Sequence, residues 1–291
     1  MQPHNECNDT KHGLPTISLL FFAEPHKITF PPYPINAIED RVSTAALFFR
    51  KVVCALLPGT FWLKRRMRNG VIVTGMNKPG FGGRGFFVFG EALEPELNFL
   101  DHFLQKGDVF VDVGANSGVF SMKAAKCVQE EGCVLAIEPL PDMLYTLYRN
   151  VTLNGFSNVR LRNFCLSDHT GRAEFWINHG RPTCSGLVRH DEKASRFSTL
   201  CLRLDELAAI EKLNRLDYLK IDVEGAESWI LAGASGVIRQ FKPIIQVEVS
   251  IDPVASLDEY VRCTYPRSPN CLLMPRGHRL LETCRRLGYK W

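Results

Sequence analysis

Between residues 109 and 250 the chain alternates short apolar runs with segments whose apolar residues recur at helical spacing. The apolar runs predict buried strands at 109–113, 133–138, 158–166, 216–223 and 243–250. The helical spacing predicts helices that start at Ser117 and Asp142, and helices over 205–212 and 226–231. Strand, helix and strand in this order form right-handed crossovers. The predicted fold class is therefore α/β, with a doubly wound, mostly parallel sheet covered by helices on both faces.

The pattern upstream of this alternation is weaker. Helical spacing predicts a helix over 42–57, and residues 1–40 are rich in Pro, His and Asn, which is typical of an irregular arm. We therefore divide the chain into an N-terminal arm and helix, 1–69, and a main domain, 70–291.

Two β-like runs, 71–75 and 85–90, flank a glycine-rich stretch. That stretch lacks the G-K-[ST] ending of a phosphate-binding loop, so we predict a hairpin there. A helix is expected next, over 94–104. Two further strands, 173–178 and 198–204, are expected as an insertion in the main domain.

Composition places the chain among globular proteins. It has 291 residues, 45% of them hydrophobic, and a net charge of +4, which gives no general reason to expect nucleic acid as a partner. No apolar stretch reaches the ~18 residues that span a bilayer, and the run 14–23 lacks a cleavage site for a signal peptide. Ten cysteines without a C-x-x-C pair predict free thiols and a cytoplasmic location.

A basic cluster follows the first predicted helix. Lys64, Arg65, Arg66 and Arg68 fall within five positions. A solvated basic face is the favoured interpretation, and a contact with an anionic membrane surface or an acidic substrate is the alternative.

The loop after the first strand of the alternation is the candidate ligand site. In such sheets ligands bind at the carboxyl ends of the strands, and VDVGANSG places Gly114 and Gly118 there, where the backbone can approach a ligand closely. The spacing differs from the dinucleotide G-x-G-x-x-G. Asp112 is an acid inside an apolar strand, so we expect it to have a cationic or N–H partner.

Glu138 ends the second strand, 138 − 112 = 26 positions after Asp112. A carboxylate at this place can accept both hydroxyls of a ribose. S-adenosylmethionine fits this arrangement because it carries a ribose and a cation but no phosphate. Two alternatives stay open: Glu138 caps the strand end, or the chain is an NAD(P)-dependent oxidoreductase.

The series VDVGANSG, AIEP, LSDHTG and KIDVEGAE resembles the FkbM-type methyltransferase family over residues 86–250. The resemblance implies a Rossmann-like class I methyltransferase that uses S-adenosylmethionine, usually to methylate a hydroxyl on a sugar, glycan or polyketide-like metabolite. It also implies a set of cofactor positions, with the last two beside adenine: Asp112, Gly114, Asn116, Gly118, Glu138, Ser167 and Asp168.

The resemblance places the acids of KIDVEGAE at the edge of the active site. A hydroxyl acceptor must lose its proton, so a carboxylate base is expected. Asp222 is our first choice for the base, with Glu224 and Glu248 as further catalytic candidates at neighbouring strand ends. The alternatives are that these acids orient Lys220, cap a helix or hold Mg²⁺; the sequence selects no metal.

The expected acceptor is a small molecule or glycan. The chain has no (N/D)-P-P-(F/Y) segment after the fourth strand, which disfavours nucleic-acid bases. His169, His179 and His190 lie in the insertion, which we expect to cover the acceptor, although each histidine alone is more typical of a surface residue.

The C-terminal end is expected to be shortened. A helix over 278–287 runs into the last residues, so two final strands are expected to be missing and the fifth strand to be an exposed edge. A homodimer or the N-terminal arm would then cover that edge. A shortened chain also keeps open a non-catalytic protein that binds S-adenosylmethionine.

Overall fold

The structure is a computed structural model that describes residues 44–56, 61–78, 80, 82–248, 257–266 and 268–291. All of them belong to one compact unit. The predicted N-terminal arm and the apolar run 14–23 lie outside the described residues. No helix among the described residues is both long and apolar enough to cross a bilayer.

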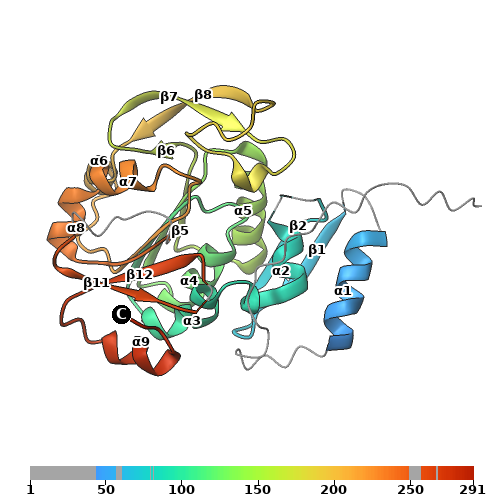
Figure 1. The fold of residues 1–291 in the computed structure, drawn as a ribbon, viewed down its shortest axis with the longest axis horizontal. Helices are drawn as coiled ribbons and strands as arrows, with labels where there is room; N and C mark the ends of the chain where they lie inside the picture. The colour runs from blue at the N-terminus through green and yellow to red at the C-terminus, as the bar shows by residue number, and fades with distance from the viewer. Residues whose placement is uncertain (1–43, 57–60, 79, 81, 249–256, 267) are drawn as a thin grey trace, which may run out of the picture. The chain divides into compact units, whose positions relative to one another are not determined.

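A seven-stranded sheet forms the centre, in the order β11-β12-β10-β9-β3-β4-β5 (Figure 1). Its strands are β3 (Val109–Val113), β4 (Cys133–Ile137), β5 (Val159–Arg162), β9 (Tyr218–Ile221), β10 (Ile244–Glu248), β11 (Tyr260–Thr264) and β12 (Asn270–Pro275). The five strands from β5 to β10 pair in parallel, as predicted. The order reverses at β3, which has β4 on one side and β9 on the other, so ligands are expected at its carboxyl end.

Helices cover both faces of this sheet, which confirms the doubly wound α/β class. The apolar residues of α3 (Pro95–Phe103), α4 (Val119–Val128), α5 (Pro141–Asn154) and α9 (Leu281–Leu287) join one core. Those of α6 (Leu204–Ile210), α7 (Glu227–Gly233) and α8 (Ser235–Phe241) join the other. The strand β3 alternates between them, because Phe110 packs into the first core and Val109, Val111 and Val113 into the second.

The expectation of a shortened sheet is wrong. β12 pairs antiparallel with both β10 and β11, and all its residues are buried, so β10 is not an edge. The two final strands precede α9 instead of following it, and the apolar run of β12 had not been assigned to a strand. The completed edge also removes the reason for expecting a second subunit there.

The hairpin near the N-terminus lies upstream of the predicted one. β1 (Trp62–Arg66) pairs with β2 (Ile72–Met76), while Gly83–Phe89 forms a helix, α2, rather than a strand. A Cβ added at Gly83 would lie 2.6 Å from the Cα of Gly75, so two glycines let α2 cross β2 closely. The domain boundary expected between residues 69 and 70 falls in the turn of this hairpin. The first predicted helix is α1 (Thr44–Leu56), which packs on α2.

The basic cluster divides between two faces of β1. Arg65 Nη1 donates to the carbonyls of Phe87 and Val88 at 2.9 and 2.8 Å, at the end of α2. Lys64 and Arg66 are exposed. The prediction of a solvated basic face therefore holds for Lys64 and Arg66 only. Arg65 points to the other side of the strand, where it binds carbonyls of α2.

The predicted insertion forms a second sheet, in the order β6-β8-β7. Its strands are β6 (Cys165–Leu166), β7 (Gly171–Ile177) and β8 (Ser195–Leu202), and a short 3-10 helix, η3 (Pro182–Cys184), connects the last two. The single strand expected over 158–166 is divided, because Asn163 Nδ2 turns to the carbonyls of Glu138 and Pro139, both at 3.0 Å.

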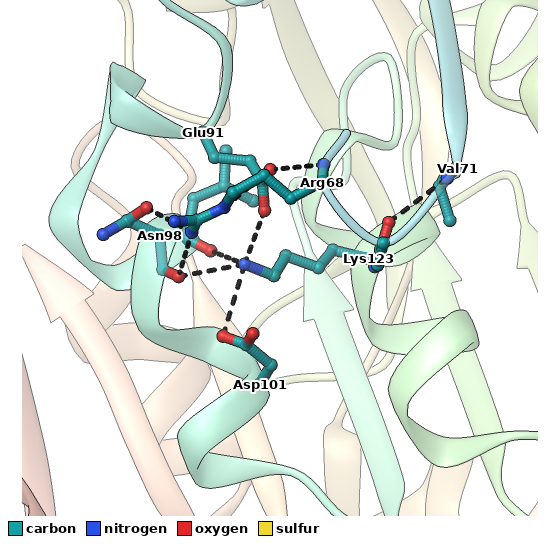
Figure 2. A network of polar contacts seen from close by, with 8 residues as sticks. Arg68, Val71, Glu91, Asn98, Asp101 and Lys123 are labelled. Carbon is teal, nitrogen blue, oxygen red and sulfur yellow. Dashed lines mark hydrogen bonds and ion pairs between the residues drawn. The ribbon is translucent and has the colours of Figure 1, made fainter. Parts of the chain in front are cut away.

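A buried lysine joins α4 to α3 (Figure 2). Lys123 Nζ donates to Glu91 Oε1 at 2.7 Å and to the carbonyls of Leu97 and Asn98 at 2.8 and 3.0 Å. Its side chain is 1% exposed and that of Glu91 is 3% exposed. Glu91 lies in a 3-10 helix, η2 (Gly90–Leu93), and also accepts the backbone N–H of Arg68 at 2.8 Å. The pair therefore links three segments through charges that are almost completely buried.

The nine cysteines in the described part of the chain are all free, and six of them are buried. This agrees with the prediction of free thiols, which pack as small apolar side chains.

Candidate active site

The glycine loop after β3 lies directly against the end of β9. Gly114 has a φ of 76°, and a Cβ there would be 2.0 Å from the carbonyl oxygen of Asp222. Gly118, with a φ of 83°, is equally tight against Leu147 of α5. Only glycine fits these two positions. At both of them the loop backbone therefore carries no side chain.

Glu138 holds this loop from the neighbouring strand. Its Oε2 accepts the N–H of Asn116 and its Oε1 accepts the N–H of Leu140, each at 2.8 Å. Burial raises the pKa of Glu138 to about 7, although the two N–H groups act in the opposite direction. A carboxylate has about four acceptor positions, so further donors such as hydroxyls can still bind.

A pocket opens beside these groups. Phe164, Leu140 and Leu187 are among its apolar walls, and Pro182, Thr183 and Ser185 close it from the insertion. Four of the predicted site residues line it: Gly114, Asn116, Glu138 and Asp222. The other six are not among the described residues that line it: Asp112, Gly118, Ser167, Asp168, Glu224 and Glu248.

Asp112 lies beneath the loop and is fully buried. Its Oδ2 accepts the hydroxyl of Ser121 at 2.6 Å, and its Oδ1 lies 3.4 Å from Lys220 Nζ. The expected cationic partner is therefore Lys220. Because the carboxylate of Asp112 is fully buried, it supports the glycine loop from below and does not form part of the pocket wall.

Lys220 connects this buried acid to the pocket. Its Nζ donates to Asp222 Oδ2 at 3.1 Å and lies 5.0 Å from the ring centre of Phe120. Burial by itself disfavours the charged lysine, but Asp222, Asp112 and Glu94 outweigh it and raise its pKa. Lys220 therefore stays charged and orients Asp222, whose side chain is 41% exposed.

Glu224 and Glu248 lie close enough to repel each other's charge. Burial, Asp222 and Glu248 raise the pKa of Glu224. Glu224 has a φ of 58°, and its carbonyl lies 2.7 Å from His190 Nε2 of the insertion. The contact between His190 and Glu224 holds the turn after β9 against the insertion. Asp222 and Glu224 both lie in this turn.

Sequence reasoning missed Glu94. It precedes α3, accepts Asn270 Nδ2 at 3.2 Å, and its pKa is raised to about 8, first by burial and then by Asp222. The signal available in the sequence was an acid directly before Pro95 at a predicted helix start, which reads as an ordinary helix terminus. Only the fold brings it to Asp222 and Lys220.

Ser167 and Asp168 follow β6. The hydroxyl of Ser167 donates to Asp168 at 3.1 Å, and Asp168 pairs with His169 at 2.8 Å on the surface. Cys165 and Leu166, just before them, line the pocket. His179 contacts Ser195, so the three histidines of the insertion do not converge.

Hydrogen bonds and a small apolar core attach the insertion to the main domain. The N–H of Thr183 donates to the carbonyl of Gly80 at 2.9 Å. Phe175 and Cys201 of the insertion share a core with Leu140 and Met143. Within the described residues, no group of three His, Cys, Asp or Glu side chains is arranged to hold a metal ion.

Glu96, next to this site, leads to a prediction about pH. It is fully buried, the hydroxyl of Ser268 donates to its carboxyl oxygens at 2.9 and 3.0 Å, and burial raises its pKa to about 7. The folded state thus keeps a proton that the unfolded chain releases above about 4.5, so this group makes stability fall as pH rises toward 7. Glu96→Gln is expected to reduce the loss of unfolding free energy between about pH 5 and pH 8 by on the order of 2 kcal/mol.

Urea unfolding at the two pH values measures this effect. The matched control is Glu130→Gln, which changes an exposed acid. An unchanged pH slope in Glu96→Gln would contradict the prediction.

The strand order and the glycine loop are those of a class I methyltransferase fold. The profile of the methyltransferase FkbM domain matches residues 112–290. The chain therefore belongs to the FkbM methyltransferase family. The match includes β11, β12 and α9, beyond the predicted extent of 86–250.

The chain is also similar to one curated methyltransferase and to several solved structures. Methyltransferase sdnD of Sordaria araneosa is 29% identical over 170 residues, which cover 46% of this chain and 65% of that protein, just under two thirds of its length. The solved structure of methyltransferase FkbM from Methylobacillus flagellatus is 19% identical, with a TM-score of 0.41, over 65% of this chain and 52% of that one. Fibrillarin of Aeropyrum pernix, solved with S-adenosylmethionine, is 12% identical, with a TM-score of 0.39, over 75% of this chain and 99% of that one.

Proposed function

We propose that the chain is an S-adenosylmethionine-dependent methyltransferase that acts on a hydroxyl oxygen of a small molecule or glycan. One observation carries the proposal: Glu138 and the glycine loop line the same pocket as Asp222. Groups suited to a ribose and a cation thus lie beside a carboxylate that can take a proton. When bound, S-adenosylmethionine supplies the electrophilic methyl group.

The residues present fit this cofactor. Gly114 and Asp222 both line the pocket and are held together by the close approach of their backbones, and Glu138 keeps acceptor capacity for ribose hydroxyls. The apolar wall of Phe164, Cys165 and Leu166 suits adenine. We keep Ser167 and Asp168 as candidates for adenine contacts through their backbone only, since their side chains bond to each other.

Asp222 is the proposed base. It is the acid among the catalytic candidates that lines the pocket, and Lys220 holds it in place. Its carboxylate would accept the proton of the acceptor hydroxyl. The close contact between the backbones of Gly114 and Asp222 would help to orient the reactants. Glu94 and Glu224 lie close enough to Asp222 for their charges to interact, and Glu248 lies near Glu224. Glu94, with a pKa of about 8, can hold a proton near neutral pH.

The acceptor and the cellular location belong to the same proposal. A hydroxylated small molecule or glycan fits a pocket closed by Pro182, Thr183 and Ser185, and no feature of the pocket calls for a nucleic-acid base. Free cysteines throughout the described residues support a reducing, cytoplasmic environment.

Cofactor affinity tests the binding half of the proposal. Glu138→Ala is expected to weaken S-adenosylmethionine at least ~10-fold, because it removes the ribose acceptor and releases the N–H of Asn116. Isothermal titration measures the affinity, with Glu130→Gln as the control because this exposed acid does not line the pocket. Saturable binding of NAD in place of S-adenosylmethionine, or equal affinities in both variants, would refute the assignment.

A further inference from the structure

The charge of this chain is unevenly distributed. Residues 41–90 contain nine Lys and Arg and no Asp or Glu, so this segment carries +9 and the remaining 241 residues carry 4 − 9 = −5. The small overall charge hides this separation. A segment of one sign attracts partners of the opposite sign, so this one favours an anionic partner.

Five of these basic residues line one concavity between α1 and β1: Arg50, Lys64, Arg65, Arg66 and Arg68. Glu91 also lines it, and its carboxylate is shared between Lys123, at 2.7 Å, and the side chain of Arg68, at 3.3 Å. Arg50, Lys64 and Arg66 form no ion pair with the described residues. The Nη1 atom of Arg50 is buried without a hydrogen-bond partner among the described residues. Positive charge is therefore concentrated there beyond what the described contacts use.

An apolar helix face belongs to the same segment. In α1, Leu47 and Cys54 are buried against Leu63 and Val88, so this side holds the helix to the protein. The other side carries Phe48, Phe49 and Leu56, which are 69, 66 and 72% exposed. Phe48, Val52 and Leu56 are four positions apart and therefore lie along one stripe.

We infer that α1 and the basic concavity beside it form a docking surface for an anionic phospholipid membrane. An exposed aromatic and aliphatic face with neighbouring basic residues suits the boundary between lipid headgroups and acyl chains. Nucleic acid would use the charge but not the apolar face. The negatively charged cytoplasmic leaflet matches the sign of the segment. The surface lies outside the pocket residues, so the inference does not depend on the proposed reaction.

Vesicle co-sedimentation of the full chain tests the inference. The chain is expected to bind vesicles of phosphatidylcholine mixed with phosphatidylserine, to bind far less to phosphatidylcholine alone, and to be released as salt is raised. This measurement needs no variant. Equal binding to both vesicle types, or to neither, would overturn the inference.

Two double variants test the two parts of the surface. Phe48→Ser/Phe49→Ser is expected to lower vesicle affinity at least ~10-fold, because two side chains no longer enter the bilayer. Lys64→Glu/Arg66→Glu is expected to lower it at least ~20-fold, because two attractive charges become repulsive. Circular dichroism establishes that each variant is folded.

Matched controls change the same kinds of residue elsewhere. Tyr148→Ser/Ile210→Ser removes side chains that are 58 and 64% exposed. Arg172→Glu/Lys193→Glu makes the same charge change at exposed positions outside the segment. Both controls are expected to bind vesicles like the unaltered chain, and equal losses in controls and variants would overturn the inference. So would a chain that binds an RNA oligomer or a second copy of itself through α1 but no vesicle.

Discussion

Asn in place of Asp222 is expected to lower the kcat of methyl transfer by ~10²–10⁴-fold, while S-adenosylmethionine still binds. The substitution keeps the shape of the side chain and its contact with Lys220 but removes the ability to take a proton. The backbone oxygen that touches Gly114 is unaffected, so the cofactor loop keeps its form. Single-turnover kinetics with a hydroxylated acceptor, together with titration of the cofactor, separate these two effects.

Glu224→Gln is the matched control for that experiment. Glu224 lies two positions away but is not among the residues that line the pocket, so its amide is expected to leave most of the activity. Equal losses in both variants would assign the proton transfer to the group of acids rather than to Asp222. A chain that binds the cofactor and transfers no methyl group to any hydroxylated acceptor would favour a non-catalytic relative and contradict the proposed function.

Met in place of Lys123 is expected to lower the free energy of unfolding by ~3–5 kcal/mol. The substitution fills much of the same space, but it removes the buried cation of Glu91, whose carboxylate keeps, as its cation, only the half-exposed Arg68 side chain at 3.3 Å. It also leaves the carbonyls of Leu97 and Asn98 without the lysine donor (Figure 2). An uncompensated buried charge is costly, whereas the intact pair is nearly neutral. Urea unfolding followed by circular dichroism measures the change.

Lys106→Met provides the comparison, because Lys106 pairs with Glu131 on the surface, where both side chains are more than half exposed. Little change in stability is expected there. The double variant Lys123→Met/Glu91→Leu is expected to recover part of the loss, since it removes the unpaired charge as well. A Lys123→Met protein as stable as Lys106→Met would show that water reaches Glu91.

The sequence was sufficient for the central part of the fold. β3, β4, β9 and β10 are apolar runs buried on both faces, and the helices between them have regular apolar spacing, so hydrophobic pattern and structure agree. The hydrophobic pattern gave a wrong prediction where close packing between two backbones determines the structure. GFFVFG, 85–90, was predicted as a strand from its composition, yet Gly83–Phe89 is a helix that packs closely on β2 where Gly83 meets Gly75.

The candidate site was predictable to the extent that it follows from strand ends. Gly114, Asn116, Glu138 and Asp222 each follow or end a predicted strand, and the sheet brings them to one pocket. Glu94 could not be found in this way, because it comes from a helix start 128 positions before Asp222 (222 − 94) and only tertiary packing places the two acids together.

Different parts of the protein would control the position of the methyl donor and the choice of acceptor. The contact between Gly114 and Asp222 belongs to the first part. In the proposed site, main-chain atoms beside the central sheet would set the donor geometry, whereas the segment that closes the pocket comes from an insertion with its own small sheet. A few hydrogen bonds and one small apolar core attach that insertion. Exchange of that segment between homologues should therefore redirect the enzyme toward new acceptors while the machinery that delivers the methyl group remains intact.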